Sequence, residues 1–279
     1  MKMNLPDFDR DFAEYLRKWM KGQKAKPEVL EAMVPDEYMK WLNTPADFLD
    51  GATPATYYGR ETDSARLLEL LFAYLDSDVP VPGPLQDRLA ELADPAPLAA
   101  YLHGALAQTV THAQEEKVMT AISLLREMSS DAAADDYIAY IARNTEPNET
   151  ADACAEALSD FPARQGAVMA AVEAAASEQA RMALLDAASH MGPSAEVVRW
   201  LKRLFLETNQ HKAVFAGLLA LQGDDSVLPV LIQSLEGSDL NYLDYLEIRH
   251  GVEALGGTCP ADRDFSGDKD YEALKNLAD

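Results

Sequence analysis

The stretch ALQGDDSVLPVLIQSL, residues 220–235, decides the fold of this chain. It joins the end of one apolar segment to the start of the next through Gly223 and two aspartates. A related pattern returns in IRHGVEALGG, residues 248–257. The anchors that align with Ala220 and Ala254 are spaced 33, 31, 32 and 34 residues apart, and the earlier ones are Leu124-Leu125, Ala157-Leu158 and Ala188-Ser189. A period of this size predicts stacked helical units that bury their apolar faces only against their neighbours.

Helical periodicity extends through most of the chain. Apolar residues recur at spacings of three and four, as in Leu67, Leu71 and Leu75, and no convincing alternating strand pattern occurs. We therefore predict an all-α fold with ten or so helices over residues 113–279. Several prolines are expected at helix starts, where their missing N–H is tolerated: Pro27, Pro35, Pro45, Pro54, Pro84 and Pro193.

The repeat divides the chain into two parts. Residues 1–110 show no clear repeat and are expected to form a divergent N-terminal helical cap, whereas residues 111–279 carry the repeats. The proline-rich segments 77–84 and 94–97 interrupt the cap and are expected to be loops.

Composition limits the functions that the chain can have. The formal net charge is −23, of which residues 1–60 carry only −1. Such an acidic surface repels phosphate backbones, so we expect no nucleic-acid partner and attraction for basic partners. No stretch approaches the roughly 20 apolar residues that span a bilayer, and the N-terminus lacks a signal-peptide pattern. We therefore expect a cytoplasmic protein without a membrane partner.

The 220–235 and 248–257 segments together resemble the HEAT repeat, and in particular the short HEAT form first known from phycobilin lyases. This resemblance implies a right-handed α-α superhelix, a HEAT-like solenoid. Coverage is clear over residues 213–257 and weaker back to residue 115. The spacing from Leu235 to Arg249 is 14 residues, longer than usual in that family. The lyase activity does not follow, because HEAT repeats serve scaffolds, adaptors and enzymes alike.

A second resemblance covers about 20 residues, from Trp41 to Pro54, and is similar to the toxin-binding domain of some Xre-type antitoxins. It depends on two Thr-Pro pairs, Thr44-Pro45 and Thr53-Pro54, and on Gly51. Helix capping explains the same residues, since threonine precedes a first-turn proline at helix starts and glycine ends helices.

Motifs for catalysis and cofactors are absent from the sequence. It contains no glycine-rich phosphate loop, no zinc-protease motif and no nucleophile elbow, and its five histidines are scattered. We expect no catalytic residues, no cofactor and no metal. The two cysteines are too few for a metal site, and Cys154 is expected to be a small core residue.

One acidic segment partly matches a calcium-binding EF-hand loop. Oxygen ligands occupy the required early positions, namely Asp262, Asp264, Ser266, Asp268 and Asp270. The closing bidentate glutamate is missing, because Ala273 stands at position 12. We therefore favour a polar turn in which Asp268 caps a last helix over residues 269–277.

A basic patch over residues 195–207 is the candidate partner-binding site. Arg199 and Arg203 lie on the arc opposite the apolar stripe of this helix, with Trp200 at the border. Tryptophan and arginine are frequent hot spots of interfaces, so we expect these three residues to contact a partner, with the indole ring half available. We expect this helix to line the concave side of the solenoid, together with three further predicted helices over residues 134–143, 166–176 and 226–236. Pairing of Glu196 with Arg199 and of Arg203 with Glu207 is the alternative explanation.

These patterns favour a non-enzymatic protein-interaction module, a HEAT-like scaffold or adaptor with an unidentified protein partner. The acidic surface favours a basic partner. Two alternatives remain open at this point. One is an antitoxin or immunity-type inhibitor of a basic target protein, and the other is an enzyme with a site in the concave groove. The oligomeric state is not indicated by the sequence.

Overall fold

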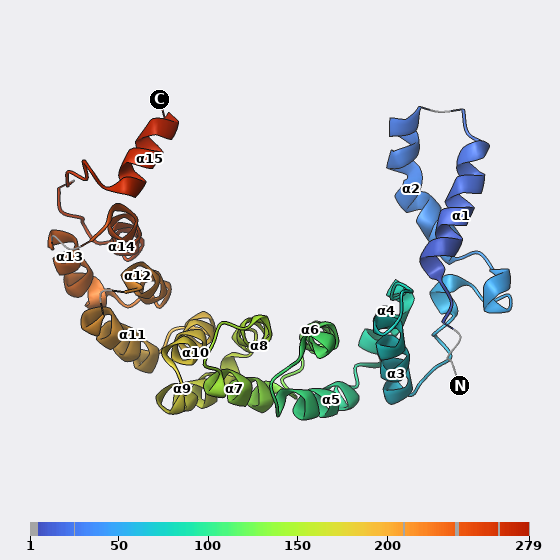
Figure 1. The fold of residues 1–279 in the computed structure, drawn as a ribbon, viewed down its shortest axis with the longest axis horizontal. Coiled ribbons are helices and arrows are strands. Elements are labelled where there is room, and N and C mark those ends of the chain that lie inside the picture. Colours follow the sequence, from blue (N-terminus) through green and yellow to red (C-terminus); the bar gives the residue numbers. More distant parts are fainter. Residues whose placement is uncertain (1–4, 25, 209, 238–239, 262, 279) are drawn as a thin grey trace. The chain divides into compact units, whose positions relative to one another are not determined.

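The computed structural model describes residues 5–24, 26–208, 210–237, 240–261 and 263–278. These residues form helices and loops with no strand among them, which confirms the predicted all-α fold (Figure 1). The chain divides into two compact units, residues 1–136 and 137–279. The predicted boundary at residue 110 marks where the sequence repeats begin. The division after residue 136 marks where the chain separates into compact units, so it does not test that prediction.

The described residues of the first unit form six complete α-helices, two short 3₁₀ helices and the start of α7 (Ala134–Arg143). The complete elements are α1 (Phe8–Lys21), α2 (Pro27–Leu42), η1 (Asp47–Leu49), η2 (Pro54–Thr56), α3 (Ser64–Leu75), α4 (Gly83–Leu92), α5 (Ala96–Leu106) and α6 (His112–Glu127). The helices α3 to α6 pack on one another. Leu67 and Leu71 of the predicted stripe are fully buried there and Leu75 is half-buried, and α6 buries Val118, Ile122 and Leu125. Of the predicted loops 77–84 and 94–97, residues 77–82 and 94–95 are loops, whereas residues 83–84 begin α4 and residues 96–97 begin α5.

Aromatic rings hold the α1/α2 hairpin onto the rest of the first unit. The ring of Phe8 lies within about 6 Å of several others: Trp41, Phe48, Tyr57 and Tyr58. The hydroxyls of Tyr58 and Tyr74 are hydrogen-bonded at 2.8 Å, and the Tyr74 hydroxyl also donates to the carbonyl of Pro6 at 2.9 Å. Burial raises the pKa of Tyr74 to about 12, so this group is a neutral donor that fastens the start of α1 to α3.

The second unit is a double row of helices. Its elements are most of α7 (Ala134–Arg143), then α8 (Glu149–Ser159), η3 (Pro162–Arg164), α9 (Gln165–Ala174), α10 (Glu178–His190), α11 (Ala195–Glu207), α12 (Lys212–Leu221), η4 (Asp225–Val227), α13 (Leu228–Glu236), α14 (Tyr242–Ala254) and α15 (Lys269–Ala278). Helices α8, α10, α12 and α14 pack on one another in turn, and α9, α11 and α13 form the other row (Figure 1). From α6 to α15 the described residues contain ten α-helices, as the period predicts.

Polar side chains link successive helical repeats of the second unit, at the spacing of the sequence repeat. The Ser177 hydroxyl donates to the carbonyl of Asn144 at 2.7 Å, 33 residues earlier. The Gln222 amide donates to the carbonyl of Ser189 at 2.8 Å, again 33 residues earlier. Each bond satisfies a backbone carbonyl near a helix end that has no partner within its own helix. The 33-residue separation in both bonds shows that the sequence period corresponds to a physical contact between neighbouring repeats.

Small residues allow the helices of one row to approach closely. Ala157, Ala187 and Ala188 are fully buried, and Ala151 and Ala180 almost so. A side chain at Gly251 would place its Cβ 3.2 Å from the carbonyl oxygen of Ala216, where α14 crosses α12. Glycine at this position therefore sets the spacing of the two helices.

Four predictions are wrong, three of them for prolines. Pro193 lies in the loop before Ser194, the cap of α11, and not in the first turn of that helix. Pro35 lies inside α2 rather than at a helix start, and Pro45 lies in a loop because the Thr44 hydroxyl donates back to the carbonyl of Lys40 instead of capping a new helix. The row containing α9, α11 and α13 was expected on the concave side. Figure 1 shows this row on the outer side of the bend that the second unit makes, with α10, α12 and α14 on the inner side.

Candidate interaction surfaces

Helix α11 spans Ala195–Glu207, the range predicted for the basic patch. Its apolar stripe is buried, with Val197 and Leu201 fully enclosed. Trp200 retains only 8% of its surface exposed, so the expectation of a half-available ring is wrong. The ring is covered by Arg203, whose guanidinium carbon lies 3.8 Å from the ring centroid. The indole thus supports the arginine and is not itself a free contact.

The two arginines of α11 keep exposed guanidinium groups. Arg199 lies 3.7 Å from Glu196 and Arg203 lies 3.9 Å from Glu207, which are long separations for ion pairs. Leu206, one helical turn beyond Arg203 on the same face, is 61% exposed. The outer face of α11 therefore presents two cations, one of them held by stacking, beside an exposed leucine.

The acidic segment after α14 forms a polar turn in its described part, residues 263–270; Asp262 lies outside the described residues. Asp264 accepts hydrogen bonds from the amide and hydroxyl of Ser266, and Ser266 lowers the pKa of this carboxyl. Asp268 accepts from the amides of Asp270 and Tyr271 at the start of α15, and from the amide of Tyr242. Asp268 therefore caps the last helix, as predicted, and Asp270 lies within that helix.

A buried carboxylate lies between the helices of the N-terminal hairpin. Glu37 is 3% exposed, although glutamate is rarely buried without a partner. It accepts a hydrogen bond from the Tyr15 hydroxyl at 3.1 Å and pairs with the ammonium of Lys40. The bond from Lys40 lowers the pKa of Glu37 below its ordinary value. These contacts fix the register of α1 against α2.

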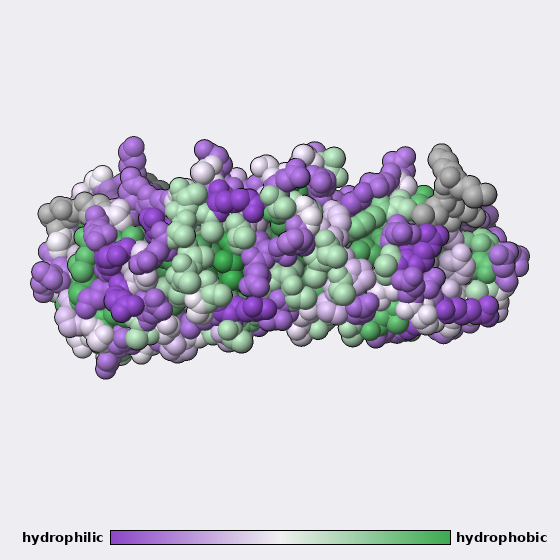
Figure 2. Space-filling view, turned by 90° about the horizontal axis from the view of Figure 1, so that it is seen from below, coloured by the Kyte–Doolittle hydropathy of each residue, from purple (hydrophilic) through white to green (hydrophobic). Residues whose placement is uncertain are grey.

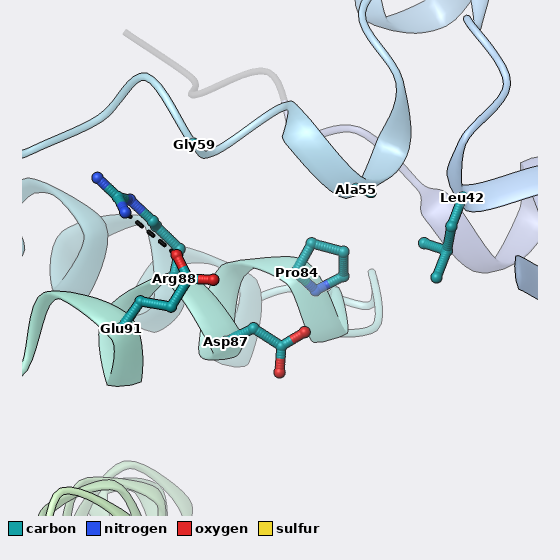
Figure 3. A pocket seen from close by; sticks show the side chains of 7 residues that line it. All are labelled: Leu42, Ala55, Gly59, Pro84, Asp87, Arg88 and Glu91. Atoms are coloured by element: carbon teal, nitrogen blue, oxygen red, sulfur yellow. Dashed lines mark hydrogen bonds and ion pairs between the residues drawn. The ribbon is translucent and has the colours of Figure 1, made fainter.

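A small hollow of about 120 Å³ lies between the end of α2 and helix α4 (Figure 3). Its polar lining consists of Asp87, Arg88 and Glu91. The Arg88 side chain points toward Glu91, 3.1 Å away, and also donates to the carbonyl of Glu61 at 3.0 Å. Arg88 thus ties α4 to the loop before α3, which is a structural role.

Charged and apolar residues alternate over the face drawn in Figure 2. Hydrophobic residues form separate patches there, each bordered by hydrophilic ones. Scattered exposed apolar residues are normal on folded proteins and carry no functional argument by themselves.

Sequence reasoning missed a second basic surface, at the distal end of the α1/α2 hairpin. Residues 17–26, RKWMKGQKAK, contain five cations and no acidic residue: Arg17, Lys18, Lys21, Lys24 and Lys26. All five side chains are exposed, and within the described part of the chain none forms an ion pair or hydrogen bond through its side chain. The five cations were visible in the sequence, but the net charge of −1 over residues 1–60 hid them, because acidic residues precede and follow the stretch.

The thiol of Cys154 is fully buried in α8, and burial raises its pKa, as expected of a core cysteine. Among the residues that the structure describes, no three histidine, cysteine or acidic side chains converge as metal ligands would. In the same residues, no helix combines the length and the apolar character needed to cross a bilayer. Compared with known proteins, the chain matches no family model, no curated protein and no solved structure.

Proposed function

We propose that this chain is a protein-interaction module, a scaffold or adaptor built from HEAT-like helical pairs. The observation that supports the proposal best is the double row of helices in the second unit, linked at the repeat spacing by Ser177 and Gln222. Stacked pairs of this kind leave one side of every helix exposed, and extended binding surfaces form on such rows.

The outer face of α11 is the surface that we assign to the partner. The guanidinium of Arg203 is held 3.8 Å above the centre of the Trp200 ring, so little side-chain freedom is lost when it binds a carboxylate. Arg199 lies one helical turn earlier, and Leu206 supplies an apolar contact beside them. A partner segment with carboxylates flanking an apolar residue fits this face. Trp200 acts as the support of Arg203 rather than as a contact.

The test is capture of partners from native cells with the full chain, followed by measurement of affinity for the captured protein. The double variant Arg199→Glu plus Arg203→Glu should weaken binding by at least ten-fold, because both cations become repulsive. The matched control is Lys269→Glu plus Lys275→Glu, which changes net charge equally on α15, and its affinity should equal that of the unmodified chain. Equal affinity for both double variants would remove α11 from the interface.

A further inference from the structure

The distal end of the α1/α2 hairpin differs in charge from the rest of the molecule. Elsewhere the chain has 19 lysines and arginines against 47 acidic residues, and many of those cations pair internally, as Arg66 does with Glu69 and Lys117 with Asp76. The five cations of residues 17–26 have no such partner within the described residues. Exposed charges that are already paired offer little to a ligand, whereas this unpaired set remains available.

Two of these cations lie beside exposed apolar residues. The bond between Tyr15 and Glu37 places these two residues at the same level and on the same side of the hairpin. Because α1 and α2 run antiparallel, Lys18, three residues after Tyr15, comes next to Met33, four residues before Glu37. One turn further out, Lys21 comes next to Val29. We call these four residues the hairpin face.

The apolar half of the hairpin face is accessible. Val29 is 51% exposed and Met33 is 38% exposed. A hollow of about 320 Å³ adjoins the face beyond Lys18, between α1 and residues 44–48, with Tyr15, Trp41 and Phe48 among its lining residues. The hairpin face thus has a row of cations, a row of apolar side chains and an aromatic hollow at one end.

We propose that the hairpin face binds an amphipathic acidic helix of a partner protein. The apolar stripe of that helix would lie on Val29 and Met33, where the flexible methionine adapts to its shape, and one large side chain would enter the aromatic hollow. Its carboxylates would pair with Lys18 and Lys21. The bound helix would be the third helix of a small bundle. Without it, α1 and α2 pack only on each other, along one line of contact.

Charge distribution favours a short acidic helix over an extended polyanion. A nucleic acid or an anionic bilayer would reach beyond the hairpin end and meet the acidic remainder of the chain. A helix about as long as α1 stays on the hairpin, where Lys18 and Lys21 pair with carboxylates at its distal end. Asp11, Glu14 and Asp47 line the hollow at the other end, so the side chain that enters the hollow must be uncharged. The inference rests on the proposed role as an interaction module, but it uses other residues in the other unit, so the two tests can fail separately.

The experiment measures binding of the full chain to designed helical peptides of about 15 residues, matched to the length of α1. One peptide carries a leucine stripe flanked by glutamates. A second replaces the glutamates by lysines, and a third scrambles the first so that composition is kept and the stripe is lost. The first peptide should bind, with affinity falling as salt is raised, and the other two should bind at least ten-fold more weakly.

Variants of the chain then locate the site. Lys18→Glu plus Lys21→Glu, and separately Met33→Asp, should each weaken binding of the first peptide at least ten-fold. The milder double variant Lys18→Gln plus Lys21→Gln removes the charges without reversing them, so it is less able to disturb the fold. It should lower the affinity for the first peptide by a smaller factor. The control Lys269→Glu plus Lys275→Glu should bind as the unmodified chain does.

Several outcomes would overturn the proposal. They are failure of the first peptide to bind, equal binding of the scrambled peptide, and insensitivity of binding to the Lys18 and Lys21 changes. Tighter binding of vesicles containing phosphatidylserine, or of a DNA duplex, with loss in the same variants would identify a different class of ligand. A dimer of the chain that these substitutions dissociate would identify a second copy as the occupant.

Discussion

At the scale of single residues, a few polar side chains determine how segments are joined. Gln222 is 3% exposed, yet its side-chain amide makes two bonds. It donates to the carbonyl of Ser189 at the end of α10 and accepts from the amide of Ser194, the residue before α11. Glu37 has the same role in the hairpin, where it joins Tyr15 to Lys40. Removing one partner of such a bond leaves a buried polar group unsatisfied.

Glu37 should make the stability of the chain depend on pH. Its pKa is lowered in the folded chain, chiefly by the bond from Lys40, so its contribution is present above the pKa of the unfolded state and is lost as pH falls through the folded value. The variant Glu37→Gln should therefore be less stable than the unmodified chain near pH 7. The difference should shrink as the pH falls below the ordinary glutamate value of about 4.3. Urea unfolding at several pH values measures it, and a difference that grows with acid would contradict the assignment.

At the scale of elements, helix periodicity predicted most helices, because apolar stripes at three and four residues must face a core. Local rules failed where tertiary packing opposed them. Pro35 carries a helix-start signal, but Leu30 and Trp41 on either side of it are both buried against the hairpin seam, and one helix spans both. The free energy gained by burying Leu30 and Trp41 outweighs the loss of the backbone hydrogen bond that the proline removes.

Replacing Pro35 should therefore stabilise the hairpin. Its side chain is exposed, and an alanine at this position restores the amide that can bond the carbonyl of Glu31. We expect Pro35→Ala to raise the free energy of unfolding by about 1–3 kcal/mol, within the roughly 3 kcal/mol that an interior proline costs. The matched change Pro27→Ala, at the first position of the same helix, should alter it by less than about 1 kcal/mol. Destabilisation by Pro35→Ala, measured by urea unfolding, would show that the ring packs in the fold.

The turn before α15 should bind calcium poorly. Asp268 already accepts backbone bonds from α15, Glu272 is bonded to the amide of Gly267, and Ala273 replaces the closing bidentate ligand. Calorimetry should give a dissociation constant weaker than about 10⁻⁵ M, outside the range of sensor loops. Sub-micromolar binding that Asp264→Ala abolishes would prove this turn to be a genuine calcium site.

The candidate surfaces were less predictable than the fold. Helical position placed Arg199 and Arg203 on the exposed arc correctly. A helical wheel did not show that Trp200 is buried or that the guanidinium of Arg203 lies over its ring. The hairpin face depends on which residues of α1 and α2 lie level. That register follows from the bond between Tyr15 and Glu37, which are 22 residues apart, and no local pattern reveals it.

At the scale of the whole molecule, the second unit is a row in which helices contact mainly their near neighbours. Helix α12 packs on α10 and α14 in its own row and on α11 in the other. Stability in such rows is the sum of unit stabilities and of the interfaces between neighbours. A weakened interface should therefore loosen the adjacent helices first, as local opening rather than collapse of the entire unit.

Hydrogen exchange of the full chain, read by mass spectrometry, tests this account most directly. The variant Gln222→Ala removes two bonds at one interface and should cost about 1–3 kcal/mol. The exposed Gln233→Ala on α13 is the control and should change exchange little. If the helices of the second unit are stabilised mainly by their near neighbours, Gln222→Ala should accelerate exchange most in α10 to α13. The effect should be smaller in α8 and α14. Equal acceleration throughout residues 137–279 would contradict a stack of repeated helical pairs.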